Sequence, residues 1–447
     1  MSVRPSAVQR LVDRIKADFE DRNWAGGDLI GAEKELCAAY GVSPSVLRQA
    51  ARVLEASGLA RMRPGNGGGL IAQGVSVRGA ASLVATYFQS IGLLAADMRV
   101  LLPPLTNLAA YAAIDRITAS DAEVLRGAVG DYRATDDAFE KGIRRGEIFQ
   151  TIGDVSHNPI LALAQRALID FLGSVTPFDD PGVWAVLLAA PLPTVPARHL
   201  VEALIAGDVL EVSSMLARHH ARAEAIANLR AAVDGGRLDA APVETGSERT
   251  RAAKLARLIL HDISRGRQPG ERLGDQPELT RRFGVSRNTY RQAVRLLEQY
   301  GAVEGRPGKG GGLFVATPNP DRVTETAYFA WRRAGATAAD RSAVLRVLLA
   351  QALDQALKHD GVRLVQRAKS VRLATPPDVA SLTDAVLDLG ASRPLAFLHR
   401  LVDDFRPADG GGEAPPGGAT GALSAFIGAL ERDDRPVAHR ALADLLR

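Results

Sequence analysis

The chain of 447 residues contains a single cysteine, Cys37, so an internal disulfide and a cysteine-based zinc site are excluded. Cys37 falls on the apolar face of a predicted helix, where we expect a small buried hydrophobic residue. The chain also lacks an apolar run of about 18 residues, because the best candidates, 101–114 and 183–196, contain prolines. The polar N-terminus has no signal-peptide core. These absences predict a soluble, cytoplasmic protein without a membrane partner.

Charge of either sign is moderate overall, but it is unevenly distributed. The net charge is +4. Residues 1–78 hold 11 Lys and Arg against 8 Asp and Glu, and residues 244–317 hold 14 against 8. These two segments together carry +9, which leaves −5 for the rest of the chain. Positive charge concentrated in two segments is typical of nucleic-acid binding.

The two basic segments are copies of one another. Residues 41–70 return as residues 284–313, with 17 of 30 positions identical and no gap. Looser echoes follow in the same order, between 86–102 and 327–349 and between 201–220 and 426–446. Similarity that recurs at a fixed offset indicates a duplicated structural unit. We therefore infer a basic head followed by a helical body, repeated in tandem.

Helix-period apolar spacing and turn residues predict a mainly α fold. Each head reads as a winged helix-turn-helix, α with a small β-wing, and each body as an antiparallel all-α domain. The predicted parts are a first head over 1–78, a first helical domain over 80–232, a linker over 233–249, a second head over 250–317 and a second, degenerate helical domain over 322–447.

Both heads contain the residues expected at a helix-turn-helix. Gly41 and Gly284 stand where the second helix must end, and glycine supplies the left-handed conformation there. Ser43 and Ser286 are suited to cap the next helix, and Pro44 fits a first turn. This next helix is the predicted recognition helix.

The predicted recognition helices have one apolar and one basic face. We expect inward-facing side chains at Leu47, Ala51, Leu54, Tyr290, Val294 and Leu297. Arg48 and Arg52 share a neighbouring face, as do Arg291 and Arg295 in the second copy. Arginines close behind a helix N-terminus can reach phosphates or guanine edges.

A glycine-rich hairpin follows each recognition helix, at 63–70 and 306–313. Arg63, Arg306 and Lys309 bring positive charge to it, and a wing of this kind contacts phosphate through side chains and backbone N–H groups. The alternative is that the arginines form a solvated helix face and the glycines a simple turn. Both features occurring together, in order and twice, favour DNA binding.

The pattern G-V-S-x-x-x-x-R-x-A-x-x-x-L-E-x-x-G with the following R-x-G-x-G-G-G-L resembles the winged helix-turn-helix of the GntR family of bacterial transcription regulators. The resemblance implies DNA contacts around the helix cap, from the arginine within the recognition helix and from the wing glycines. Carried over to this sequence, these positions are Ser43, Ser45, Arg48, Gly67, Ser286, Arg287, Asn288, Arg291 and Gly310.

The two heads depart differently from the family pattern. The family usually has arginine directly after the turn serine, where the second head has Arg287 but the first has Pro44. The family often has a further arginine in the preceding helix, where this chain offers Lys34 and Pro277. We therefore expect related but unequal half-site preferences.

The segment 80–232 resembles the FCD domain of the FadR-like branch of that family. Many members hold a divalent metal with one aspartate and three histidines, and the metal grips a carboxylate effector. Here His199 and His219 occupy two histidine positions, Gln150 the third, and Gly146 the aspartate position. No cofactor is therefore expected, and Gln150, His199 and His219 are weak candidates for effector binding.

Three readings of this region stay open. Glu147, Asp154 or His157 can complete a metal site if their helix phases point inward. A polar pocket can bind a carboxylate effector without metal. The histidines can also be packed or solvated residues of an Ala/Leu-rich core.

The resulting hypothesis is a transcription regulator, a repressor, that binds a double-stranded DNA operator. One chain can act as a pseudo-dimer, or two chains can form a homodimer with four heads. An alternative is an architectural DNA-binding protein without ligand control. An enzyme using His199, His219 and His220 is a third reading, but no nucleophile–base pair, phosphate loop or complete metal set supports it.

Overall fold

The computed structural model describes residues 7–445, apart from positions 23, 25, 57–58, 64, 66–67, 94, 136–137, 176–195, 234–247, 265–266, 300, 307, 309, 318, 374–378, 391, 408–418 and 433. The described residues are mainly helical, and their strands lie in two small antiparallel sheets. This confirms the predicted fold class of two winged heads with helical domains. The predicted linker falls almost entirely outside the described residues.

The first head alternates helices with short strands. Its elements are α1 (Ala7–Arg22), β1 (Leu29–Gly31), α2 (Glu33–Tyr40), α3 (Pro44–Ala56), β2 (Ala60–Arg63) and β3 (Gly69–Ala72). The sheet order is β1-β3-β2, with both pairs antiparallel. Helix α2 ends at Gly41, whose φ of 66° is left-handed, as predicted.

The second head repeats this order. Its elements are α13 (Glu248–Ser264), β4 (Arg272–Gly274), α14 (Gln276–Phe283), α15 (Arg287–Gln299), β5 (Val303–Arg306) and β6 (Gly312–Val315). The sheet order β4-β6-β5 matches that of the first head, and Gly284 ends α14 with a φ of 62°.

The predicted inward faces are largely confirmed. Leu47, Ala51, Leu54, Tyr290 and Leu297 are buried. Val294 is only partly buried. Cys37 is also only partly buried, contrary to the expectation, because α2 is an outer helix that buries Leu36 alone.

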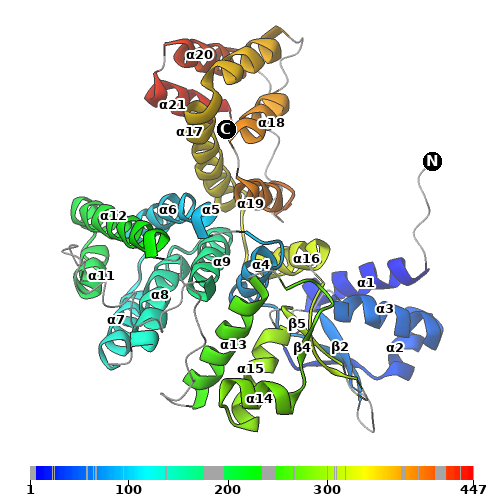
Figure 1. Ribbon diagram of the computed structural model, residues 1–447. Coiled ribbons are helices and arrows are strands. Elements are labelled where there is room, and N and C mark those ends of the chain that lie inside the picture. The colour runs from blue at the N-terminus through cyan, green and yellow to red at the C-terminus, as the bar shows by residue number, and fades with distance from the viewer. Residues whose placement is uncertain are drawn as a thin grey trace.

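The first body is built from helices only. They are α4 (Val77–Ser90), α5 (Ala95–Arg99), α6 (Leu102–Ile114), α7 (Ala119–Arg133), α8 (Ala138–Asp154), α9 (Pro159–Val175), α11 (Ala197–Ile205) and α12 (Val209–Val233). Helix α4 packs along α9, and α8 packs between α7 and α9 (Figure 1).

The second body is likewise helical. It comprises α16 (Pro320–Arg333), α17 (Ala338–Leu373), α18 (Val379–Gly390), α19 (Arg393–Asp403), α20 (Ala419–Glu431) and α21 (Arg435–Leu445). The long helix α17 is kinked at Asp360, where the backbone leaves helical geometry. In the described part of the chain, no helix is both long and apolar enough to cross a membrane.

The heads pack crosswise onto the bodies. Helix α1 of the first head contacts α16 of the second body, where the rings of Phe19 and Phe329 meet edge to face at 5.5 Å. Lys16 Nζ lies 2.9 Å from Glu325 Oε1 in the same contact. Conversely, α13 of the second head packs on α4 and α9 of the first body. Helices α4 and α16, which begin the two bodies, pack against each other at the centre of the molecule (Figure 1).

One hydrophobic core runs through the first head and both bodies, whereas the second head has a core of its own. Phe88 of α4 illustrates the shared core, since its ring lies 6.3 Å from that of Phe171 in α9 and 5.4 Å from that of Phe397 in α19. The first head is therefore continuous with the bodies, and the second is attached mainly through α13.

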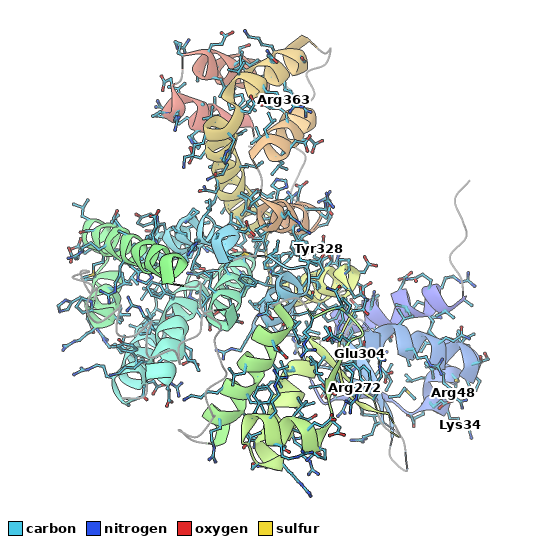
Figure 2. All side chains as sticks on the ribbon, viewed as in Figure 1. Lys34, Arg48, Arg272, Glu304, Tyr328 and Arg363 are labelled. Atoms are coloured by element: carbon cyan, nitrogen blue, oxygen red, sulfur yellow. The ribbon has the colours of Figure 1, made fainter. Side chains whose placement is uncertain are left out.

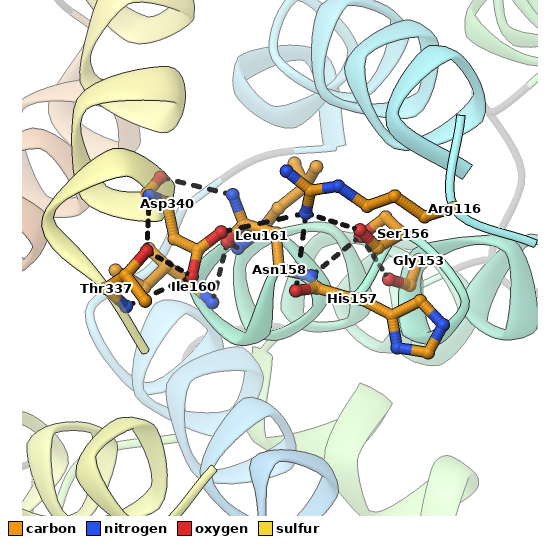
Figure 3. A network of polar contacts seen from close by, with 9 residues as sticks. All are labelled: Arg116, Gly153, Ser156, His157, Asn158, Ile160, Leu161, Thr337 and Asp340. Carbon is orange, nitrogen blue, oxygen red and sulfur yellow. Dashed lines mark hydrogen bonds and ion pairs between the residues drawn. The ribbon is translucent and has the colours of Figure 1, made fainter. Parts of the chain in front are cut away.

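A buried polar network joins the two bodies beside this core (Figure 3). Asn158 caps α9 by accepting hydrogen bonds from the backbone N–H groups of Ile160 and Leu161. Its Nδ2 donates to the backbone carbonyl of Asp340 in the second body, at 3.1 Å. The Asp340 carboxylate in turn accepts from Thr337 and so fixes the start of α17. These hydrogen bonds thus hold the N-terminal ends of α9 and α17 next to each other.

Candidate nucleic-acid interface and effector region

The recognition helix of the first head presents its predicted DNA-binding residues to solvent. Ser43 caps α3 weakly, with its Oγ accepting from the Val46 N–H at 3.4 Å. Ser45, Arg48 and Arg52 are exposed along the helix. Lys34 is exposed on α2, at the same outer end of the head as Arg48 (Figure 2). The predicted residues of this helix and of α2 therefore share one accessible surface.

Arg48 is already engaged on that surface. Its Nη2 lies 2.8 Å from Glu33 Oε1, and its Nε donates to the same oxygen at 2.9 Å. The two side chains are 65% and 35% exposed, so the ion pair is screened by water and weak. Sequence reasoning missed Glu33, although its place at the start of the preceding helix signals an acid close to the recognition helix.

The recognition helix of the second head is more strongly basic and less constrained. Ser286 caps α15 by accepting from the Thr289 N–H at 3.0 Å. Arg287, Asn288, Arg291 and Arg295 are all exposed. None of its three arginines has an ion-pair partner among the described residues, and Gln276 stands at the position of Glu33. These three guanidinium groups can therefore meet an anionic partner without breaking an internal pair.

The wing of the second head, formed by β5 and β6, is stabilised by side chains of its own sheet. Arg306 lies over the ring of Phe314, with 4.2 Å from its guanidinium carbon to the ring centroid, and pairs loosely with Glu304. Arg272, which sequence reasoning also missed, donates from Nε to the Gly311 carbonyl at 3.2 Å. Gly310 has a φ of +80°, a conformation that favours glycine. These contacts of Arg306 and Arg272 stabilise a short, basic hairpin beside α15.

The corresponding wing of the first head is only partly described. Arg63 is exposed and pairs in register with Gly69. Gly67 and, in the second head, Lys309 lie outside the described residues. Gly69 packs so tightly on β1 that an added Cβ would stand 2.3 Å from the Gly31 carbonyl oxygen. The DNA-contact role of all these residues stays a prediction.

Helix, turn, recognition helix and β-wing, present twice with the same strand order, define a protein with two winged helix-turn-helix domains. The family model described as bacterial regulatory proteins of the gntR family matches residues 7–69 and 251–313. Each head therefore matches the DNA-binding domain of the GntR family, and the chain carries two copies of this domain in tandem.

Individual relatives match parts of the chain. A putative HTH-type transcriptional regulator RmpR of Mycobacterium gastri is 32% identical over 123 residues, which cover 26% of this chain and 44% of that protein. The match thus spans less than half of that relative. Among solved structures, Streptococcus agalactiae GntR has 19% identity and a TM-score of 0.34, covering 50% of this chain and 98% of that one. A GntR family member from Pseudomonas syringae pv. tomato str. DC3000 has 18% identity and a TM-score of 0.24, covering 51% and 88%.

The three candidate effector residues do not converge in the first body. Gln150 is buried in a separate network, where its Nε2 donates to Asp170 and its Oε1 accepts from Arg166. His199 is exposed on α11. His219 lies in α12, stacked on the ring of Phe149 with centroids 4.3 Å apart. His219 lies in a second polar cluster, apart from the network of Gln150, and the effector role of the three stays a prediction.

That cluster is made of basic groups. Arg145 Nη2 donates to His219 Nδ1 at 3.1 Å, and His220 Nε2 contacts Asn107 Oδ1 at 3.1 Å. Burial, and secondarily the charge of Arg145, lower the pKa of His219 to about 3. Burial lowers the pKa of His220 to about 4. Both imidazoles are therefore neutral at physiological pH.

The residues present do not fit the metal that the FCD resemblance implies. In the described parts of the chain, no three His, Cys, Asp or Glu side chains gather as a metal site requires. The three proposed substitutes are engaged elsewhere: Glu147 pairs with Arg144, Asp154 with Arg166, and His157 with Asp121.

Proposed function

We propose that this protein is a sequence-specific transcription regulator whose two heads bind one double-stranded DNA operator. The observation that carries the proposal is the pair of equivalent recognition helices, α3 and α15, each with exposed arginines and a following wing. In such domains the recognition helix lies in the major groove, and arginine reads guanine there. Phosphate contacts from the wing and helix cap set the register.

We further propose that one chain acts as a pseudo-dimer. The contact of α1 with α16 and the packing of α13 on α4 support this, because each head is held by the opposite body (Figure 1). Two heads held in one molecule raise each other's effective concentration at the operator. A homodimer with four heads is the competing arrangement, and the mass of the protein and of its DNA complex in solution distinguishes them.

We assign the regulator as a repressor controlled by a small anionic effector in the first body. A protein that covers an operator with two heads excludes other proteins from it. The first body is suited to control the second head, because α13 packs directly on α4 and α9. An effector that shifts these helices has a short route to α15, which packs on α13.

The test is a mobility-shift titration with DNA from upstream of the protein's own coding sequence. Arg48→Ala, Arg291→Ala and the double variant are compared at one salt concentration. We expect each single variant to weaken binding about five- to 100-fold, since a bidentate base contact contributes about 1–3 kcal/mol. Unchanged binding by the double variant would show that these helices do not read DNA. DNA binding that no effector alters would favour the architectural alternative.

A further inference from the structure

Arg145 stands at the centre of the basic cluster in the first body, on α8 facing α12. Its guanidinium is half-buried and hydrogen-bonds to the neutral ring of His219. Tyr132 and Arg222 are its other electrostatic neighbours, and Arg222 repels it. Within the described residues, this guanidinium therefore has no carboxylate partner.

The neighbouring Arg144, in contrast to Arg145, has carboxylate partners. Arg144 Nη1 lies 2.9 Å from Glu147 Oε2, and Nη2 lies 3.3 Å from Glu140 Oε1. It is thus doubly neutralised on the same helix. A guanidinium cannot lose its charge in a protein, so burial without an acid is costly unless an anion is supplied from outside.

The Arg145–His219 hydrogen bond also determines which nitrogen of His219 is free. Because a guanidinium only donates, Nδ1 of His219 must accept and carries no proton. That nitrogen cannot bind a metal while Arg145 occupies it. The charge that a metal would bring to this position is instead carried by the arginine.

We propose that Arg145 binds a small anion directly, as a carboxylate or a phosphate group, in place of a metal-held ligand. The fork of the guanidinium fits two oxygens of either group in a bidentate contact. Arg222 adds a second positive charge to the cluster. The anion's role as an effector rests on the proposed function, whereas its binding does not.

The structure suggests how such an anion is held. The aromatic face of Phe149 supports the His219 ring from one side, and Asn107 fixes His220 beside it. These contacts hold the imidazoles in place, so little reorganisation is needed when an anion reaches Arg145. Partial burial excludes water and strengthens the charge-assisted hydrogen bonds.

The test is calorimetric titration of the full chain, without DNA and with EDTA present, using acetate, benzoate and inorganic phosphate as separate probes. We expect at least one probe to bind, and Arg145→Gln to weaken that binding about tenfold or more, as the loss of charged hydrogen bonds predicts. Arg144→Gln is the matched control, because it removes the same charge one residue away. We expect it to bind like the unchanged protein.

Arg145→Lys separates charge from geometry, and thermal melting of each variant shows that it is folded. We expect the lysine variant to bind more weakly than the unchanged protein but better than Arg145→Gln. The carboxylate and phosphate probes show which anion the site prefers. Three outcomes would overturn the proposal: no probe binds, binding requires added Zn²⁺, or Arg145→Gln binds equally well. DNA affinity, measured separately, shows whether the proposed function fails independently.

Discussion

Arg48 reaches back across the first head to Glu33, with 2.8 Å between Nη2 and Oε1, whereas its counterpart Arg291 faces a head that has Gln276 at that position. The repeat makes this an internal comparison, because the two recognition helices have the same layout and differ in this neighbour. In the first head, a phosphate or base must compete with Glu33 for the guanidinium. In the second head a phosphate or base meets no such competition for Arg291, because Gln276 carries no charge.

Replacing Glu33 by Gln should therefore strengthen DNA binding by the first head. An exposed ion pair contributes up to about 1 kcal/mol, so we expect about a two- to fivefold gain. The gain is measured by mobility shift in the Arg291→Ala background, where binding depends on the first head. The reciprocal change, Gln276→Glu, should weaken the second head by a similar factor in the Arg48→Ala background.

A double-mutant cycle shows whether the effect passes through Arg48. In a protein that already carries Arg48→Ala, the Glu33→Gln change should lose most of its effect, leaving only the removal of one distant negative charge. An equal gain with and without Arg48 would mean that Glu33 repels DNA directly, and the ion pair would then be irrelevant.

The salt dependence of binding should report the phosphate contacts of the second head. Each contact releases counterions, so the logarithm of affinity falls with the logarithm of salt by about 0.9 per contact. Arg295 is exposed one turn beyond Arg291. Arg295→Ala should make the slope shallower by about one. Arg126→Ala, in a pair with Glu202 on the first body, should leave the slope unchanged.

The heads were predictable from the sequence because their information is local. A glycine at a helix end, a serine before the next helix and a glycine-rich hairpin determine conformation within a few residues. The structure accordingly confirms the helix ends at Gly41 and Gly284 and the antiparallel hairpin of both wings. The pattern did not show the ion pair between Glu33 and Arg48, because these residues lie on different helices and meet only in the folded head.

The bodies were less predictable because their contacts are long-range. Apolar spacing predicts helices, but it does not show that α1 contacts α16 or that one core joins both bodies. Nor did it show that Gln150 serves a buried network with Arg166. Arg145 went unnoticed for the same reason: a lone arginine in an amphipathic helix is usually solvated, and only the fold places His219 against it.

Gly312 should be essential for the stability of the second head. Its φ is +137°, and a Cβ there would stand 2.7 Å from the backbone oxygen of Gly274 in β4. Gly312→Ala should therefore cost about 1–3 kcal/mol in urea unfolding of this head. Gly127→Ala serves as the control, because it lies within α7 with no atom near the added Cβ and should be neutral or stabilising by up to about 1 kcal/mol. A neutral result for Gly312→Ala would refute the close packing of the wing.

The bond from Asn158 to Asp340 should contribute to the coupling of the two bodies. Asn158→Asp keeps an oxygen that can cap α9 but removes the donor to the Asp340 carbonyl. It should lower the free energy of unfolding by about 1–3 kcal/mol, since a buried carbonyl loses its partner. Asn158→Ala removes the cap as well and should cost about 0.5–2 kcal/mol more. Equal stability of Asn158→Asp and the unchanged protein would show that this hydrogen bond does not contribute to the contact between the two bodies.

His399 should make the second body sensitive to acid. The side chain lies in α19, is 5% exposed, and burial lowers its pKa. Asp403, Asp384 and Asp404 oppose this shift, whereas Arg341 adds to it. Because the folded state holds the imidazole neutral, the unfolded chain takes up a proton first as the pH falls below about 6.5. The stability that His399 contributes is thus fully present above that pH and is lost below it.

Urea unfolding from pH 8 to pH 5 measures this loss. Below about pH 6.5, one proton taken up only by the unfolded chain costs up to about 1.4 kcal/mol per pH unit. His399→Gln cannot titrate, so its unfolding free energy should fall less steeply than that of the unchanged protein. His199→Gln, on the exposed face of α11, should leave the slope as it is. If both variants follow the unchanged protein, the acid sensitivity arises elsewhere, and the folded state protonates the imidazole of His399 as readily as the unfolded chain does.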